Sequence, residues 1–173
     1  MSQTFNYIEI HGNDAVNSVV LKIVEKSDEY KNLNPATYSK HFISSVFYGE
    51  NYADFQKSGA DLVTKYLHTD VIGANEFVFI SGSSTPDSFQ DYLTEKFATL
   101  DPHVLLVNSF NSTDDEVGQY YSVCKDAANG DYSICYAFIN SESDSKSATK
   151  KQLKNLAAQI PWECKFLNSE IKK

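Results

Sequence analysis

The chain has 173 residues, of which 42% are hydrophobic, and it carries a formal net charge of −8 at pH 7. This length fits a single domain covering residues 1–173, and no apolar run is long enough to span a membrane. Three Cys residues do not make the framework of a disulfide-rich secreted protein, so the sequence predicts a cytoplasmic location.

The basic residues are all Lys, and they are distributed unevenly. Residues 1–145 contain 8 Lys and 21 Asp or Glu, whereas residues 146–173 contain 7 Lys and 2 Glu. Arg supplies the guanidinium fork that reads guanine edges and phosphates, so an acidic chain without Arg is poorly suited to direct nucleic-acid binding. The charge instead favours a protein partner that has a basic surface.

The first elements expected are a strand and a helix. Residues 4–10 alternate between apolar and polar side chains, which is typical of a strand, and Asn13 can cap the helix that follows. The apolar side chains of that helix recur at helical spacing: Val16, Val19, Val20, Ile23 and Val24. Two more helical patterns, which begin at Asn34 and Asn51, predict a helical insertion at about 34–68.

Residues 76–110 form the unit around which we expect the fold to be organised. The apolar run 77–80 suits a buried strand, and Pro86 stands at the first position of a helix. The turn between them consists of Gly82, Ser83, Ser84 and Thr85. Helical spacing then joins Phe89, Tyr92, Leu93, Phe97 and Leu100, and a second short strand is expected at 104–107.

Asn129 and Gly130 form the strongest two-residue hairpin signal of the chain. If they are the turn, the register follows by counting outward, with Val123 opposite Tyr136, Tyr121 opposite Phe138, and Cys124 opposite Cys135. We expect the first two pairs on an apolar face and the two Cys on a less buried face. A slip of one residue would exchange the two faces.

Residues 146–173 are expected to form a basic C-terminal helix and strand. The helix has one apolar face and ends at Pro161, and alternation of Trp162, Cys164 and Phe166 predicts the strand. Four lysines gather near and on the helix: Lys146, Lys150, Lys151 and Lys154. We interpret them as a solvated face, or one docked on the acidic body, with a phosphate-binding face as the alternative.

Short βαβ steps combined with a hairpin predict an α+β domain. The expected architecture is a mostly antiparallel sheet with helices packed on one face. A ferredoxin-like, split βαβ arrangement is the solution that best fits this order of elements.

The segment 76–121 also resembles a known family. A strand runs into Thr85-Pro86, a helix ends with Leu93, Lys96-Phe97 and Leu100, and a strand and a loop lead to Gly118 and Tyr120-Tyr121. This pattern, with the N-terminal strand that ends in Gly12, resembles the YubB-like, ferredoxin-fold family of unknown function carried by phages and plasmids. The resemblance implies a fold and a mobile-element context, but it implies no activity.

Two stretches are candidate binding sites. Gly82, Ser83, Ser84 and Thr85 precede a helix, where free backbone N–H groups can hold an anion, although an ordinary helix cap explains the same residues. An acidic surface for a basic partner is expected from five carboxylates: Asp114, Asp115, Glu116, Asp126 and Asp131. A solvated acidic loop is the simpler interpretation of Asp114, Asp115 and Glu116.

The Cys and His residues carry no pattern of a catalytic or metal site. The chain has no Cys-x-x-Cys and no His-Glu-x-x-His, so we predict no metal, no cofactor and no catalytic residue. The three Cys are interpreted as inert, partly buried thiols.

The leading functional hypothesis is a non-enzymatic accessory protein of a phage or plasmid. It would present an acidic, Tyr-bearing surface to a basic host or phage protein, for example as an anti-defence inhibitor of the anti-CRISPR or anti-restriction type in the host cytoplasm. One alternative is a small-molecule, nucleotide or anion-binding protein that uses the turn at Gly82–Thr85. The other alternative is a structural or self-assembling phage subunit.

Overall fold

The computed structural model describes residues 3–30, 68–73, 75–81, 87–113 and 116–173. Its elements are β1 (Thr4–His11), α1 (Asp14–Tyr30), β2 (His68–Gly73), β3 (Glu76–Ser81), α5 (Asp87–Ala98), β4 (Leu105–Ser112), β5 (Val117–Lys125), a 3-10 turn (Ala127–Asn129), β6 (Ser133–Asn140), α6 (Lys146–Gln159) and α7 (Lys165–Lys172). The helical insertion predicted at 34–68 lies outside the described residues, except for His68, which begins β2.

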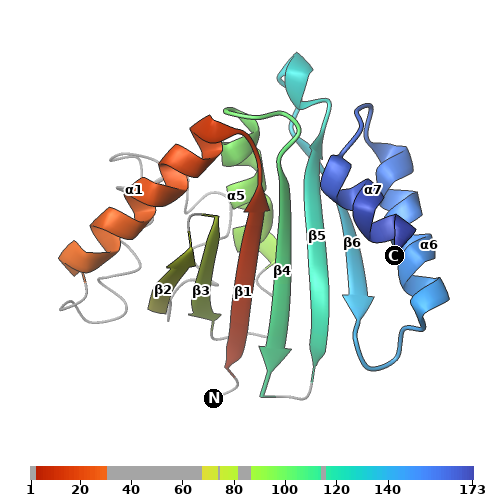
Figure 1. The fold of residues 1–173 in the computed structure, drawn as a ribbon, viewed down its shortest axis with the longest axis horizontal. Coiled ribbons are helices and arrows are strands. Elements are labelled where there is room, and N and C mark those ends of the chain that lie inside the picture. Colours follow the sequence, from red (N-terminus) through yellow and green to blue (C-terminus); the bar gives the residue numbers. More distant parts are fainter. Residues whose placement is uncertain (1–2, 31–67, 74, 82–86, 114–115) are drawn as a thin grey trace.

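The strands form one sheet in the order β2-β3-β1-β4-β5-β6, and every neighbouring pair is antiparallel (Figure 1). β1 lies between β3 and β4, and α5 connects β3 to β4 along the chain. The order β2-β3-β1-β4 is that of a split βαβ unit, to which β5 and β6 are added as successive hairpins. The predicted α+β class, with an antiparallel, ferredoxin-like sheet, is confirmed.

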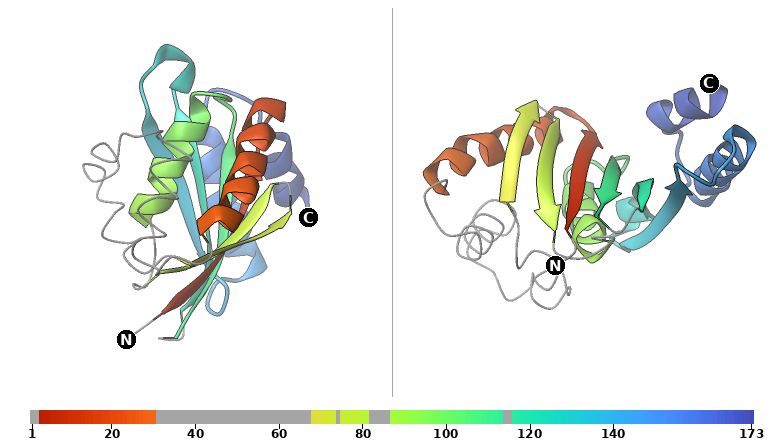
Figure 2. Two further views of the ribbon diagram at one scale, coloured as in Figure 1. Left: turned by 90° about the vertical axis from the view of Figure 1, so that its left-hand side faces the viewer. Right: turned by 90° about the horizontal axis from the view of Figure 1, so that it is seen from below.

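Two separate apolar clusters lie on the two faces of the sheet. Phe89 and Leu93 of α5 pack with Ile8 of β1, Leu106 of β4 and Val16 of α1 in the first cluster. The second cluster joins the opposite face of β4, β5 and β6 to α6 and α7 through Leu153, Leu156 and Leu167. Figure 2 shows α5 and the α6–α7 pair on opposite sides of the strands. The α6–α7 pair therefore forms a second helical layer on the other face of the sheet, whereas the sequence predicted helices on one face.

Local sequence explains the first two elements. Along β1, Ile8 and Ile10 are buried while Phe5 is 51% exposed, which is the alternation expected of a strand. The side-chain Oδ1 of Asn13 accepts a hydrogen bond of 3.1 Å from the backbone N–H of Val16. Asn13 is therefore the N-terminal cap of α1, as predicted.

The register predicted for the β5–β6 hairpin is wrong by one residue. Val123 pairs with Cys135, and Ser122 pairs with Tyr136. Instead of a two-residue turn, the chain makes a 3-10 turn that ends at Gly130, which has a φ of 78°. This longer loop shifts the count, and because side chains alternate along a strand, the two faces of β6 are exchanged.

In the observed register, the two thiols that were predicted to face each other are not paired: Cys124 is opposite Ile134, and Cys135 is opposite Val123. Cys124 is fully buried in the first cluster, under α5, and Cys135 belongs to the second cluster, under α6. The two side chains therefore point to opposite faces of the sheet, and they cannot form a disulfide without rearrangement of the strand.

The strand predicted at the C-terminus is a helix, α7. Leu167 is fully buried, and Ile171, four residues later, packs against the same cluster, so the apolar residues follow helical spacing. Trp162 and Cys164, which suggested a strand, lie in the segment between α6 and α7 and pack into the core there.

Within the described ranges, no helix has the length and hydropathy needed to cross a membrane.

Candidate functional site

The predicted anion-binding turn, formed by Gly82, Ser83, Ser84 and Thr85, lies outside the described residues. Two members of the predicted acidic surface, Asp114 and Asp115, also lie outside them. The structure therefore places only three of the nine predicted site residues.

Those three carboxylates do not form one surface. Glu116 is exposed directly before β5, whereas Asp126 and Asp131 lie in the loop at the far end of β5. A strand of 9 residues separates them, which corresponds to about 30 Å at the usual rise per residue. The charges that the sequence singled out are spread along the molecule.

A different set of carboxylates is aligned on α5. Asp87, Asp91 and Glu95 follow one another at intervals of four residues, so they lie on one face of the helix. The opposite face is buried, with Phe89, Leu93 and Phe97 in the first apolar cluster. The spacing of these carboxylates is visible in the sequence, and it was the signal that the sequence analysis missed.

Buried hydrogen bonds fix α5 against the sheet. The side-chain amide of Gln90 donates to the backbone oxygen of Tyr120 at 3.0 Å and to the Ser122 hydroxyl at 2.9 Å. The Thr94 hydroxyl lies 2.8 Å from the same Ser122 oxygen. All of these groups are shielded from water, so the register of α5 over β5, and with it the place of Asp91, is tightly specified.

Two exposed aromatic side chains lie on β6 and stack on aromatic residues of the neighbouring strands. β6 is the last strand of the sheet, and its Tyr136 and Phe138 are 60% and 37% exposed. Tyr136 stacks on Tyr120 of β5 with 5.5 Å between ring centroids, and Phe138 lies 5.6 Å from Phe110 of β4. Large side chains that remain exposed while resting on a buried aromatic layer are typical of a contact surface.

Tyr120 connects the two groups of side chains. Its hydroxyl donates a hydrogen bond of 2.9 Å to Oδ1 of Asp91, and its ring supports Tyr136. We define the aromatic–carboxylate surface as Asp87, Asp91 and Glu95 of α5 with Tyr136 and Phe138 of β6. It combines negative charge with exposed aromatic area at one edge of the sheet.

Burial raises the pKa of the Asp91 carboxyl to about 6, although the hydrogen bond from Tyr120 acts in the opposite direction. Burial also raises the pKa of Glu95, and it raises that of the Tyr120 hydroxyl, where the charge of Asp91 adds to the effect. Asp91 is therefore a carboxylate held where its ionised form is poorly solvated.

Asp91→Asn should stabilise the protein at pH 7. The pKa of Asp91 is higher in the folded chain than in the unfolded chain. The protonated carboxyl therefore stabilises the folded state below about pH 4, and this stabilisation is lost as the pH rises through about 6. The amide removes this loss and can still accept the Tyr120 hydrogen bond, so the free energy of unfolding should rise by about 1–2 kcal/mol at pH 7. Urea denaturation at pH 7 and at pH 4 measures the difference.

At pH 4 the gain from Asp91→Asn should shrink toward zero, while Glu142→Gln in an exposed turn should change stability little at either pH. A loss of stability at pH 7 in the Asn variant would show that the ionised carboxylate is stabilising, contrary to this account.

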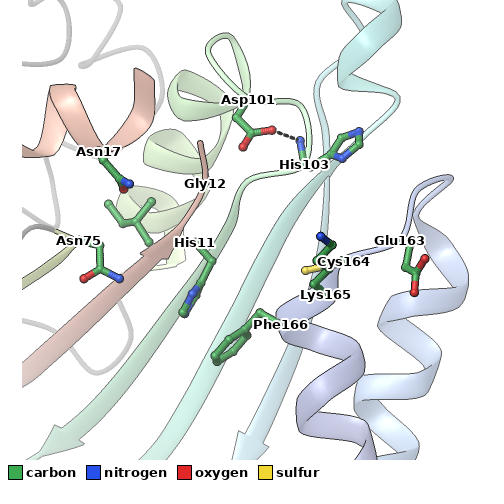
Figure 3. Close-up of a pocket in the computed structure, with 11 residues that line it drawn as sticks. His11, Gly12, Asn17, Asn75, Asp101, His103, Glu163, Cys164, Lys165 and Phe166 are labelled. Atoms are coloured by element: carbon green, nitrogen blue, oxygen red, sulfur yellow. Dashed lines mark hydrogen bonds between the residues drawn. The ribbon is translucent and has the colours of Figure 1, made fainter. Parts of the chain in front are cut away.

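The second candidate site is a cleft at the end of β1, with a volume of about 580 Å³. Its walls come from β1, α1, the β2–β3 turn, the loop before β4 and the start of α7 (Figure 3). The His11 ring stacks on Phe166 at 3.7 Å, which joins β1 to α7 across the sheet face. Gly12 lies at the start of this cleft, where an added Cβ would come within 2.9 Å of Val16.

Asp101 holds two parts of the cleft wall together. Its Oδ1 accepts a 2.8 Å hydrogen bond from the backbone N–H of His103, and its Oδ2 accepts one of the same length from the N–H of Asn13. The His103 ring is parallel to that of Trp162, with 5.1 Å between centroids. The loop before β4 is thus tied to the start of α1 and to the segment before α7.

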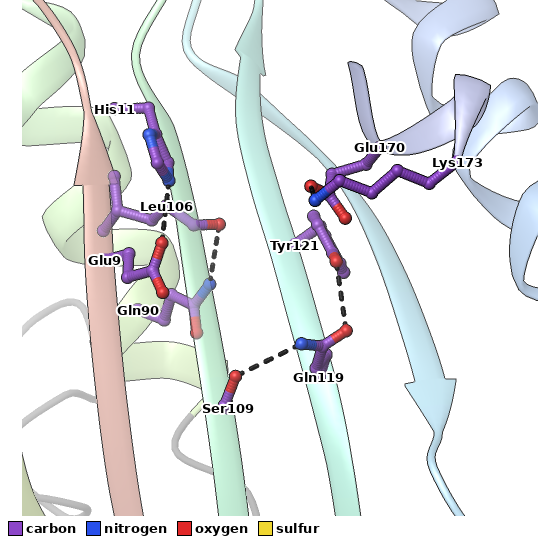
Figure 4. Close-up of polar contacts among 9 residues, drawn as sticks. All are labelled: Glu9, His11, Gln90, Leu106, Ser109, Gln119, Tyr121, Glu170 and Lys173. Carbon is purple, nitrogen blue, oxygen red and sulfur yellow. Dashed lines mark hydrogen bonds and ion pairs between the residues drawn. The ribbon is translucent and has the colours of Figure 1, made fainter. Parts of the chain in front are cut away.

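Several polar side chains on the sheet face that carries α7 bind one another (Figure 4). Nε2 of His11 lies 3.2 Å from Oε2 of Glu9. The Tyr121 hydroxyl donates to Gln119 at 3.0 Å, and Gln119 donates to the Ser109 hydroxyl at 3.3 Å. Burial lowers the pKa of His11, and the charge of Glu9 opposes that shift.

Among the described residues, no group of three or more His, Cys, Asp or Glu side chains could hold a metal ion. Burial raises the pKa of Cys124 to about 12, so this thiol is not a ready nucleophile at neutral pH.

Comparison with known proteins found no match among protein-family models, curated proteins or solved structures. The resemblance to the YubB-like family therefore stays a prediction.

Proposed function

We propose that this protein is a non-enzymatic binding protein that presents the aromatic–carboxylate surface to a basic segment of a partner protein. The observation that carries the proposal is the exposure of Tyr136 and Phe138 on β6, together with Tyr120, which stacks on Tyr136 and hydrogen-bonds to Asp91 of α5. The molecule as a whole has a net charge of −8, which attracts a basic partner at long range.

The two kinds of side chain serve different steps of such binding. Exposed aromatic rings supply most of the contact energy at protein interfaces, and a Lys or Arg of the partner can pack on the face of a Tyr ring. Asp87 is exposed and Glu95 is half-buried, so they can pair with further cations around the rings. Charge then selects the partner and speeds the encounter, while the aromatic residues hold it.

The specific form that we propose is a phage or plasmid accessory protein that inhibits a host defence enzyme, of the anti-CRISPR or anti-restriction type. Such enzymes hold nucleic acid in basic grooves, and an acidic surface with aromatic residues can occupy such a groove. This more specific step rests on the sequence resemblance and on the net charge, and it is separate from the binding surface itself.

Reversing the charge of α5 tests the proposal. The tagged protein is used to capture partners from a bacterial lysate at low salt, and the variant Asp87→Lys with Glu95→Lys is compared with it. The matched control, Glu116→Lys with Glu142→Lys, makes the same change in net charge at two exposed residues outside α5. The α5 variant should lose the partner at least about tenfold, and the control should keep it.

Salt provides the second readout of this experiment. A complex formed through the carboxylates should dissociate progressively between about 50 and 500 mM salt, because screening weakens pairs of exposed charges. A partner that both variants retain, or whose capture does not respond to salt, would contradict binding through α5.

A further inference from the structure

The outer side of α6 carries a cluster of lysines that the proposed function does not use. We define the lysine face as Lys146, Lys150, Lys151 and Lys154, all of which belong to this one helix. The four side chains line a shallow hollow together with Ser147 and Asn155, and no carboxylate lines it. α6 and α5 lie on opposite sides of the strands, so the lysine face is remote from the carboxylates of α5 (Figure 2).

The packing of α6 fixes the direction of the lysine face. Leu153 and Leu156, on the other side of the helix, are buried in the second apolar cluster. Lys146, Lys150 and Lys154 follow one another at intervals of four residues, so they form a row with a spacing of about 6 Å. Lys150 is half-buried and the other lysines of the face are exposed. The sheet therefore holds a row of cations toward the solvent.

Neighbouring side chains do not neutralise this row. None of the four ammonium groups forms a hydrogen bond or an ion pair with a described residue. α6 itself contains no Asp or Glu, and the carboxylates that adjoin it in the chain are Glu142 and Asp144 before it and Glu163 after it. Residues 141–173 contain these three carboxylates and Glu170, so 7 Lys stand against 4 acidic residues, a balance of +3. The region stays positive when every carboxylate is counted as charged.

The net charge of −8 predicted no direct binding of nucleic acid, but this total combines two opposite sides of the sheet. Salt at physiological concentration largely screens exposed charges that are more than about 8–10 Å apart. The lysine face therefore acts on a polyanion at short range, while the carboxylates of α5 are shielded by the sheet and by the salt between them.

The side chains of the lysine face favour one kind of polyanion. Lys, Ser and Asn are common ligands of nucleic-acid phosphates, and Lys has no planar fork that would read the bases. No aromatic side chain lines the hollow, so nothing there can stack on the bases of a single strand. The apolar side of α6 is buried against the sheet, and it cannot enter a lipid bilayer.

The length of the row also fits a duplex. Lys146 and Lys154 are eight residues apart, which corresponds to about 12 Å along the helix. One strand of a duplex carries a phosphate about every 3.4 Å along its axis, so the row faces roughly three or four phosphates.

We propose that the lysine face binds the phosphate backbone of double-stranded nucleic acid without reading its sequence. The lysines pair with successive phosphates, and Ser147 and Asn155 donate hydrogen bonds beside them. The aromatic–carboxylate surface then points away from the duplex, so a basic protein and a nucleic acid can occupy the two sides of the molecule together.

The test measures the fluorescence anisotropy of a labelled DNA duplex of about 20 base pairs with the full-length protein. The Kd should be below about 100 μM at about 50 mM salt, and log affinity should fall with log salt with a slope of about −3. Two unrelated sequences should bind within about twofold of each other, and a single strand of the same length should bind more weakly.

Two charge-matched variants locate the contact. Lys150→Gln with Lys154→Gln should weaken binding of the duplex at least about tenfold and reduce the salt slope by about 2. The control, Lys22→Gln with Lys125→Gln, makes the same change in net charge at exposed residues of α1 and β5. It should keep both the affinity and the slope, and thermal unfolding checks the fold of each variant.

Absence of binding at low salt would overturn the proposal, and so would an equal loss in both variants, which would reflect net charge alone. Tighter binding of the single strand would rule out the duplex. Tighter binding of vesicles of phosphatidylcholine and phosphatidylserine, or of polyglutamate, would assign the face to a membrane or to an acidic protein instead. None of these outcomes affects the aromatic–carboxylate surface, whose test uses residues of α5 and a captured protein.

Discussion

Phe89→Ala should lower the free energy of unfolding by about 3–5 kcal/mol, because it removes a fully buried ring and leaves a cavity between α5 and the sheet. Phe89 is 1% exposed and belongs to the apolar cluster that joins α5 to β1 and β4. A domain of this size is stable by about 5–15 kcal/mol, so this single substitution should remove a large part of the total. Urea denaturation followed by circular dichroism measures the loss.

Leu21→Ala is the control for this cavity. Leu21 lies on α1 and is 48% exposed, so its truncation should change the stability by no more than about 0.5 kcal/mol. If the Phe89→Ala variant were as stable as the Leu21→Ala variant, α5 would not be docked on the sheet as described. The aromatic–carboxylate surface would then have no fixed geometry.

The double variant Tyr136→Thr with Phe138→Thr should weaken partner binding about 100-fold, with little change in stability. Truncation of an aromatic anchor at an interface costs about 2 kcal/mol or more, and 2.7 kcal/mol corresponds to about 100-fold. Both side chains are exposed, and Thr keeps the preference of β6 for a strand. The affinity of the captured partner is measured with purified proteins, and thermal unfolding checks the fold.

Phe5→Thr is the matched control for the aromatic residues of β6. Phe5 is 51% exposed and lies on β1, in the interior of the sheet rather than on its edge strand. Its replacement should leave the affinity unchanged. An equal loss of affinity in both variants would indicate a general effect of surface hydrophobicity, and no loss in the β6 variant would remove the aromatic residues from the binding account.

Much of the fold could be predicted from local sequence. The alternation in β1, the Asn13 cap and the apolar face of α5 each depend on residues that are close together in the chain, and each is confirmed. The order of these elements was sufficient to predict the antiparallel, ferredoxin-like sheet. Local signals of this kind are the ones that periodicity and capping report best.

The errors occurred where a single local choice decides a larger arrangement. The loop around Gly130 is longer than a two-residue turn, and this one difference reversed the faces of β6. The prediction consequently placed Tyr136 and Phe138 opposite Tyr121 and Val123, on a shared apolar face. In the structure these two aromatic residues lie on the sheet face that carries α5, and both side chains remain exposed to solvent.

The two sites differ in how well they could be predicted from the sequence. The carboxylates Asp87, Asp91 and Glu95 have helical spacing, so that half of the surface was accessible from the sequence. The cleft was not accessible, because Asn17, Asn75 and Lys165 are far apart in the chain and are brought together only by the sheet order and by α7. Because a strand was expected in place of α7, the sequence did not predict the side of the cleft that Lys165 and Phe166 form.

Site-specific photo-crosslinking is the most direct measurement of the central claim, that the surface formed by α5 and β6 contacts a basic partner. A photo-reactive phenylalanine is placed at Tyr136 in one protein and at Lys151, on the exposed face of α6, in another. We expect the Tyr136 probe to give an adduct with a Lys- or Arg-rich segment of another protein, and the Lys151 probe to give none. Adducts from Lys151 alone, or adducts from Tyr136 only with a second copy of this chain, would contradict the account.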